Sequence, residues 1–321
     1  MKISNKLKER FCKDCNIPIK IYDEPYFTDR LELFDKFYKT KEKWNMFINE
    51  LGKYNCEQDY FEEYNRVKDA AIESIKNSEC YKRFNKEDMN KFAVVHKNLP
   101  NKDIFRPTNN GRIFISIDMK KANFSSLKYY EDSIGESIFG WASTWEDFIK
   151  SFTDNKHIIN SKYIRQVILG NCNPKRHITY EKYLMEQVLS CLYNIVDEKR
   201  VASFSNDEIV YDMTSASGLD TLNLVKWLIE ERLSEKFNIP FSVELFTLHK
   251  IYGTEGYYKK IFKENGETNI EFKCLSNYML PFVIRRFLGE EITDSDKTFI
   301  YEGLVSKFIE IPNIEVTLNG I

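Results

Sequence analysis

The sequence predicts an α+β protein with an antiparallel sheet, and three observations lead to this fold class. Helical periods rich in aromatic and charged residues dominate the first hundred positions. Short β-prone runs then alternate with helical periods, and several of these runs are joined by tight turns. With 321 residues, of which 42% are hydrophobic, the chain is long enough to bury one large core or two ordinary ones.

Residues 1–110 are predicted to form a mainly helical N-terminal region. The runs FDKFYKTKEKWNMFINEL and YFEEYNRVKDAAIESIKN repeat aromatic residues at helical spacing, which indicates two or three amphipathic helices with their rings packed inward. Two prolines and an Asn-Asn-Gly turn signal interrupt this pattern between residues 96 and 112. We therefore expect a boundary there.

Residues 111–275 are predicted to form the sheet and the helices that pack on it. IFISID, ending on Asp118, is typical of a short strand, and KANFSSLKYY behind it favours a helix. STWEDFIKSF and SKYIRQVILG have helical periods that start at Ser or Thr, and Pro174 can open a further helix to about residue 196. RVASFSNDEIVYDM, residues 200–213, predicts a hairpin with an acidic turn.

The remaining elements follow from the same signals. A helical period covers LDTLNLVKWLIEERLSEKF, and PFSVELFTL predicts a strand. GYYKKIF and TNIEFKCL form a second predicted hairpin, because the Asn-Gly in ENGE between them is a strong turn signal. Residues 276–321 are predicted to be a helical C-terminal extension.

Composition limits the classes of protein to which the chain can belong. Its 47 basic and 49 acidic residues give a formal charge of −2, which by itself indicates no partner. Apolar runs of membrane-spanning length are absent, and no apolar stretch follows the basic N-terminus as it would in a signal peptide. Seven scattered cysteines favour reduced thiols over disulfides. We therefore expect a soluble, cytoplasmic protein without a membrane partner.

Cys12 and Cys15 have the spacing of a zinc knuckle. A structural zinc ion needs four ligands, and no second pair of this kind follows. Two reduced thiols are the simpler interpretation.

Three carboxylates stand where strands are predicted to end or turn. Asp118 ends one strand, and Asp207 and Glu208 occupy the turn of the hairpin, where an Asn-Gly or Asp-Gly pair would be more usual. If the strand and the hairpin are neighbours in one sheet, the three side chains converge. Close carboxylates repel one another without a cation, whereas two Mg²⁺ or Mn²⁺ ions about 4 Å apart would make them a clamp for phosphoryl transfer.

These segments resemble the right-hand palm of nucleic-acid polymerases. IDMKKANFSSL is similar to motif A, and its Asp-x-x-x-Ala-x-Phe-Ser spelling is particularly similar to reverse transcriptases. FSNDEIVYD resembles motif C, with the Asp-Glu pair of family A DNA polymerases. SKYIRQVILGNCNPKRHITYEKYL stands where motif B belongs, and HKIYGTEGYYKKIF resembles the primer-holding element of family B. The resemblance covers about residues 118–263 and lacks the YGDTDS and YxDD spellings, so it indicates the superfamily and no single family.

The resemblance implies roles for individual residues. Asp118 and Asp207 would bind two Mg²⁺ or Mn²⁺ ions, and Glu208 would support them. Asn123, five residues after the motif A aspartate, would lie against the ribose 2′ position, where its small side chain would admit ribonucleotides. The alternative is that Asn123 caps the helix behind it.

Basic residues between and beyond the carboxylates are candidates for contacts with nucleotides and nucleic acid. Six basic residues and one acid, Glu181, lie between residues 155 and 182. Lys162 and Arg165, three apart on one helical face, could hold a triphosphate, and Asn171 in the loop after them could bond a base or sugar. Candidate contacts to the nucleic-acid backbone are Lys175, Arg176, Lys259 and Lys260, although strand alternation puts the last two on opposite faces.

Three functions remain open at this stage. The first is a template-directed polymerase acting on template, primer and nucleoside triphosphates, compatible with RNA synthesis and with membership of a larger replication or transcription complex. The second is a non-catalytic, palm-like nucleic-acid-binding or assembly protein, to which the near-neutral charge and incomplete motifs point. The third is another two-metal enzyme, such as a nuclease or a terminal nucleotidyltransferase.

Overall fold

Helices α1 to α5 make up the N-terminal part of the computed structural model, which describes residues 3–96, 99–100, 104–216 and 218–316. Ser4 and Ser78 accept hydrogen bonds from backbone N–H groups and so cap α1 and α5. Their aromatic stripes are buried, which confirms the predicted helical character of this region. The helices are α1 (Asn5–Asp14), α2 (Tyr26–Tyr38), α3 (Thr40–Leu51), α4 (Glu57–Asn77) and α5 (Glu79–Lys86).

The first strand and a run of helices follow the predicted boundary, part of which lies outside the described residues. Side chains of Thr144, Asn155 and Ser161 cap α7, α8 and α9, and Pro174 is the first residue of α10. These elements are β1 (Ile113–Met119), α6 (Ala122–Ile134), α7 (Trp145–Lys150), α8 (Lys156–Asn160), α9 (Lys162–Gly170) and α10 (Pro174–Leu192).

The predicted hairpins, the helix between them and the intervening strand are all present. They form β2 (Val201–Phe204), β3 (Glu208–Asp212), α11 (Leu219–Lys236), β4 (Phe241–Tyr252), β5 (Tyr257–Phe262) and β6 (Thr268–Lys273). Short 3₁₀ helices occur at η1 (Met89–Phe92), η2 (Pro107–Asn109), η3 (Glu198–Arg200) and η4 (Ser295–Lys297).

The C-terminal segment differs from the helical extension predicted for it. After α12 (Leu280–Leu288), its described residues form a hairpin of β7 (Thr298–Tyr301) and β8 (Leu304–Lys307) and a short strand, β9 (Glu315–Val316). β9 returns to pair with the far end of β4. The apolar run LPFVIRRFL gives the helical signal of this segment, whereas the pairing of β9 depends on a strand some sixty positions earlier that the local pattern does not reveal.

All strand pairs in the described residues are antiparallel, in agreement with an α+β fold. The main sheet has the order β2-β3-β1-β4-β5-β6, with β9 attached to β4. β1 therefore lies at the centre, between the acidic hairpin and the long strand β4. This order brings the end of β1 beside the turn of the hairpin.

The two faces of the sheet have different surroundings. Ile115, Ile117 and Leu245 point into the main hydrophobic core, which also contains residues of α6, α10 and α11. Phe114 and Phe246 point to the other side, into a small separate cluster. The main core continues without a break into the N-terminal helices, so the predicted N-terminal and sheet regions share one core.

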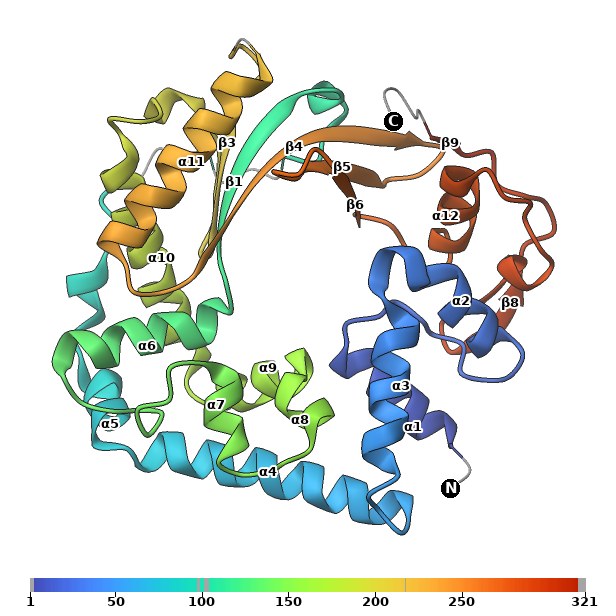
Figure 1. Cartoon of the computed structure of the whole chain (residues 1–321), viewed down its shortest axis with the longest axis horizontal. Helices are drawn as coiled ribbons and strands as arrows, with labels where there is room; N and C mark the ends of the chain where they lie inside the picture. The colour runs from blue at the N-terminus through green and yellow to red at the C-terminus, as the bar shows by residue number, and fades with distance from the viewer. Residues whose placement is uncertain (1–2, 97–98, 101–103, 217, 317–321) are drawn as a thin grey trace.

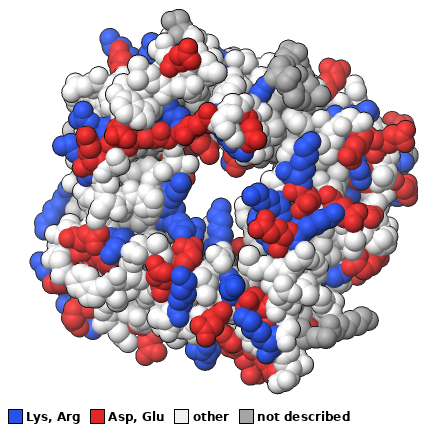
Figure 2. Space-filling model, in the orientation of Figure 1, with Lys and Arg blue, Asp and Glu red and all other residues white. Residues whose placement is uncertain are grey.

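The elements surround the centre of the molecule. In Figure 1 the sheet arches over the top, α4 runs along the bottom, and α1 to α3 stand beside α12 on the right. The space-filling view shows an opening in the middle, with Lys and Arg side chains on both sides of it (Figure 2). The sheet face that does not carry α10 and α11 turns toward this opening (Figure 1).

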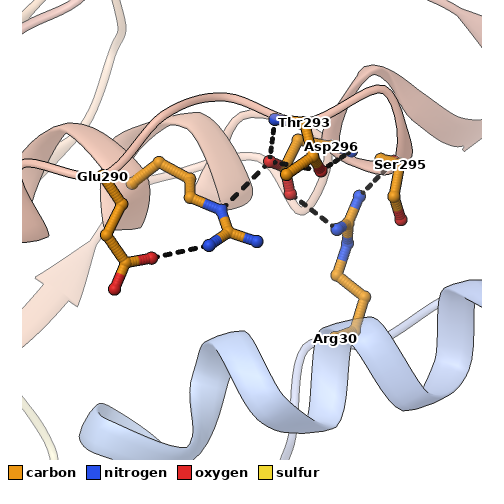
Figure 3. A network of polar contacts seen from close by, with 6 residues as sticks. Arg30, Glu290, Thr293, Ser295 and Asp296 are labelled. Atoms are coloured by element: carbon orange, nitrogen blue, oxygen red, sulfur yellow. Dashed lines mark hydrogen bonds and ion pairs between the residues drawn. The ribbon is translucent and has the colours of Figure 1, made fainter.

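A buried polar network joins the two ends of the chain on the right of the molecule. Arg30 in α2 lies 2.9 Å from Asp296 and donates a second bond to the Ser295 carbonyl (Figure 3). Arg285 and Thr293 also bond to Asp296, a residue that is 1% exposed. Each buried charge has a partner here, so the network fixes α2 against the C-terminal segment.

Candidate active site

Asp118 and Glu208 are direct cross-strand neighbours in the pair β1–β3. On the other side of β1, Ser116 stands opposite Glu244 of β4. Because side chains alternate along a strand, all of these point to the sheet side that faces the central opening. We call this side, defined by Asp118, Glu208 and Glu244, the acidic face.

Asp207 lies at the turn beside the acidic face. Its carbonyl accepts a hydrogen bond of 2.8 Å from Met119 N–H, the residue after Asp118. The strand and the hairpin are thus neighbours, and the structure pairs Asp118 with Glu208 and places the backbone of Asp207 beside them. Glu244, which sequence analysis did not single out, adds a further carboxylate.

The local sequence explains why the acidic turn forms without glycine. The Ser205 hydroxyl accepts hydrogen bonds from the backbone N–H of Glu208, at 3.0 Å, and of Asp207, at 3.4 Å. Neither Asn206 nor Asp207 has a positive φ, so the turn does not need the residues that favour that conformation. Asp207 is left exposed at the tip.

Asp118 is in an unfavourable electrostatic environment for a carboxylate. Burial, followed by the charges of Glu208, Asp207 and Glu244, raises its pKa from 3.8 to about 7. Burial also raises the pKa of Glu244. The acidic face therefore carries more negative charge than its surroundings balance.

Lys259 supplies the nearest opposing charge. Its side chain is buried, and its Nζ lies 4.4 Å from the centre of the Phe246 ring and 3.8 Å from Glu208 Oε1. It starts from β5, so β4 and β1 lie between it and the strand of Glu208. The sheet is curved, so the side chain of Lys259 reaches across β4 and β1 and lies over the acidic face.

This position corrects the role predicted for Lys259. A buried ammonium paired with a carboxylate is not available to a nucleic-acid backbone on the surface. Lys260 is half-buried, stands opposite Thr247 and points away from the acidic face. Lys259 and Lys260 do lie on opposite faces of the sheet, as expected. Lys259, however, is buried beside Glu208 and does not lie on the surface.

Glu181 is a second carboxylate that sequence analysis did not assign. It lies buried in α10, and burial and then the charge of Asp207 raise its pKa to about 7. It therefore approaches the acidic turn from the helical side of the sheet. In the sequence, Glu181 could have been noticed because it is the single acid in an otherwise basic segment.

Arg165 lies close to the segment that follows Asp118. Burial lowers its pKa, and Glu146 opposes that effect. Glu146 also forms an ion pair with Lys121, three residues after Asp118. The buried Nε of Arg165 has no hydrogen-bond partner among the described residues.

The start of the basic helix α9 is held by the N-terminal helices. Ser161, which caps α9, donates a hydrogen bond of 2.8 Å to the buried Asp14 of α1. Lys162 is exposed on the first turn. Asn171 is exposed at the other end, where its amide donates to the Val167 carbonyl.

The two basic residues that open α10 have different positions. Lys175 is exposed. Arg176 instead donates hydrogen bonds to the carbonyls of Phe84 and Glu87 at the end of α5. Its guanidinium therefore joins two helices, which does not fit the predicted contact with nucleic acid.

Asn123 does not cap a helix. Helix α6 begins at Ala122, its N-cap residue is Lys121 in the left-handed conformation, and no side chain caps it. Asn123 is half-buried, and its side chain makes no hydrogen bond within the described part of the chain. The capping alternative is therefore wrong, whereas the predicted ribose contact stays a prediction.

The donor chemistry of the acidic face suits a hard divalent cation. Carboxylate oxygens are the ligands that Mg²⁺ takes in proteins, and burial together with the neighbouring carboxylates raises the pKa of Asp118, an effect that a bound cation would oppose. In the described ranges, however, no three or more His, Cys, Asp and Glu side chains stand close enough together to hold a metal ion. The exposed Asp207 would have to turn toward Asp118 and Glu208 to complete such a set.

Comparisons with known proteins add no further assignment. Protein-family profiles, curated proteins and solved structures yield no match to this chain. Among the described residues, no helix is both long enough and apolar enough to span a membrane.

Proposed function

We propose that the protein is a template-directed nucleotidyltransferase whose chemistry occurs at the acidic face. The observation that carries the proposal is the direct pairing of Asp118 with Glu208, beside Asp207, on a sheet face turned toward a central opening. An antiparallel sheet with helices on one face and carboxylates on the other also agrees with the palm that the motifs resemble.

In this proposal each residue has a role that depends on its position. Asp118, Asp207 and Glu208 would hold two Mg²⁺ or Mn²⁺ ions, which supply charge for the transferring phosphoryl group when bound. A primer 3′ hydroxyl forms the new bond to the α-phosphorus, pyrophosphate leaves, and the hydroxyl proton passes to solvent. Lys121, which pairs with Glu146, and Arg165, whose pKa the charge of Glu146 raises against the effect of burial, would bind the triphosphate.

Lys259 favours a second candidate function. Its ammonium already lies 3.8 Å from Glu208 and is a fixed positive charge on the acidic face. A palm-like sheet that uses an internal lysine in place of a metal ion would bind nucleic acid without turnover. This alternative predicts that magnesium does not bind to the acidic face.

The experiment is extension of a labelled primer by the purified protein with Mg²⁺ or Mn²⁺. Addition that follows the template supports the polymerase proposal. Untemplated tailing or cleavage would replace it with another two-metal enzyme. Binding without any product, together with no magnesium binding, would favour the non-catalytic alternative.

A further inference from the structure

A charged hollow lies between the N-terminal helices and the edge of the sheet. Its volume is about 870 Å³, within the range of about 300–1,000 Å³ that is usual for ligand sites. Six lysines and two glutamates line it. The lysines are Lys13, Lys20, Lys36, Lys39, Lys43 and Lys273. We call this hollow the lysine cavity.

Most of the positive charge of the lysine cavity is not neutralised within the protein. Lys13 pairs with Glu9, and Lys273 pairs with Glu271. The other four lysines form no ion pair with any described residue. Several like charges around one hollow repel one another, so an anionic ligand would stabilise this arrangement.

The lysines at the turn between α2 and α3 are held in a defined conformation. Lys39 has a left-handed backbone, with φ of 51°. Asp35 accepts a hydrogen bond of 2.8 Å from Lys41 N–H, and the Thr40 hydroxyl donates to the Leu31 carbonyl. The turn is therefore built, and it presents Lys36, Lys39 and Lys43 to the same hollow.

Aromatic side chains lie among the lysines. Tyr22, Phe37, Tyr38, Tyr163 and Phe272 all line the lysine cavity. Aromatic faces accept stacked bases of any sequence, and lysines follow a phosphate backbone, which is the usual combination for single-stranded nucleic acid. An acidic peptide would use the lysines but would not need the rings.

The lysine cavity adjoins the acidic face at Glu244. Glu244 belongs to both, and Glu271, which also lines the cavity, stands directly opposite Lys259 across β5 and β6. A strand in the cavity would thus lead to Asp118. α1, α2 and α3 provide one wall, and β4 to β6 provide the other.

We propose that the lysine cavity binds a single-stranded segment of nucleic acid and leads it to the acidic face. This inference deepens the proposed function and rests on it for the direction of the strand, but binding itself does not require catalysis. It also assigns a nucleic-acid-binding role to the N-terminal helices, for which no sequence motif indicates a function.

The test is the salt dependence of binding to a short fluorescein-labelled oligothymidylate, followed by fluorescence anisotropy in magnesium-free buffer. The variant combines Lys36→Gln, Lys39→Gln and Lys43→Gln. Its matched control combines Lys41→Gln, Lys86→Gln and Lys199→Gln, three exposed lysines outside the cavity with the same loss of charge. Circular dichroism checks that both variants are folded.

We expect the cavity variant to bind more weakly and to reduce the slope of log K against log salt by about 2, since each phosphate contact on a single strand contributes about 0.7. The control should keep the wild-type slope. Equal slopes for variant and wild type would overturn the proposal, and so would polyglutamate that competes as well as the oligonucleotide does. Absence of primer extension by the wild type, together with the expected smaller slope in the cavity variant, would instead count against the proposed catalysis alone.

Discussion

Replacing Asp118 with Asn should stabilise the folded protein in metal-free buffer above neutral pH. Asp118 lies beside Glu208, and burial together with nearby carboxylates raises its pKa from 3.8 to about 7. A carboxyl group with a raised pKa in the fold opposes folding once it ionises. Asn has nearly the same shape and cannot ionise, so it removes this cost and keeps the packing.

The magnitude and the pH window follow from the two pKa values. Below pH 3.8 the group is neutral in both states and has no effect, and between pH 3.8 and about 7 the folded state loses stability as pH rises. Each pKa unit corresponds to about 1.4 kcal/mol, so the full effect at pH 8 is about 4 kcal/mol. Asp118 is partly exposed, and solvent screening lowers our expectation to about 2 kcal/mol.

The assay is urea unfolding of wild type and Asp118→Asn at pH 5 and pH 8 in the presence of EDTA. We expect the gain at pH 8 to be at least twice the gain at pH 5. Asp154→Asn, an exposed aspartate without an ion pair in the described structure, is the control and should change little at either pH. An Asp118→Asn variant that is less stable than wild type at pH 8, or equally shifted at both values, would refute the reasoning.

Three further predictions concern other parts of the molecule. Lys259→Met should lower the free energy of unfolding by about 1–2 kcal/mol at pH 8, where the ammonium faces the ionised Asp118, and by less at pH 5, because Asp118, whose pKa burial raises to about 7, is then protonated; an equal loss at both pH values would show that only packing is affected. Asp296→Asn should cost about 3–5 kcal/mol in urea unfolding because it leaves Arg30 buried without its counter-charge, and a loss under 1 kcal/mol would contradict the stabilising role of the network. Asn123→Tyr should shift single-nucleotide addition from NTP toward dNTP, whereas a strong dNTP preference in the wild type that the substitution leaves unaltered would remove Asn123 from the sugar site.

Local patterns in the sequence predict most elements and the position of the acidic turn. The strand that ends on Asp118, the hairpin that presents Asp207 and Glu208 and the helix opened by Pro174 are all present. Each depends on residues close together in the chain, such as turn-forming groups, caps and alternating apolar positions. We assumed from the sequence that β1 and the hairpin are neighbours in one sheet, and the register of β1 with β3 confirms this assumption.

The same patterns do not predict contacts between distant segments. Lys259 crosses two strands to reach Glu208, and this requires a sheet curvature that alternation alone does not specify. Arg176 binds carbonyls of α5, some ninety residues earlier. β9 pairs with β4 after a helix and a hairpin have intervened. In each case the long-range partner, rather than the residue type, decides what the side chain or strand does.

Single-nucleotide addition to a labelled primer, compared between wild type and Asp207→Asn in magnesium, tests most directly whether the acidic face is a nucleotidyl-transfer site. Asp207 is exposed, so its substitution should leave the fold intact, and Asp220→Asn, another exposed aspartate, is the matched control. We expect templated addition by wild type and by the control, with a loss of at least about 100-fold in Asp207→Asn because a metal ligand is removed. Addition by Asp207→Asn at the wild-type rate, or no addition by well-folded wild type with either Mg²⁺ or Mn²⁺ on any primer and template, would contradict the account.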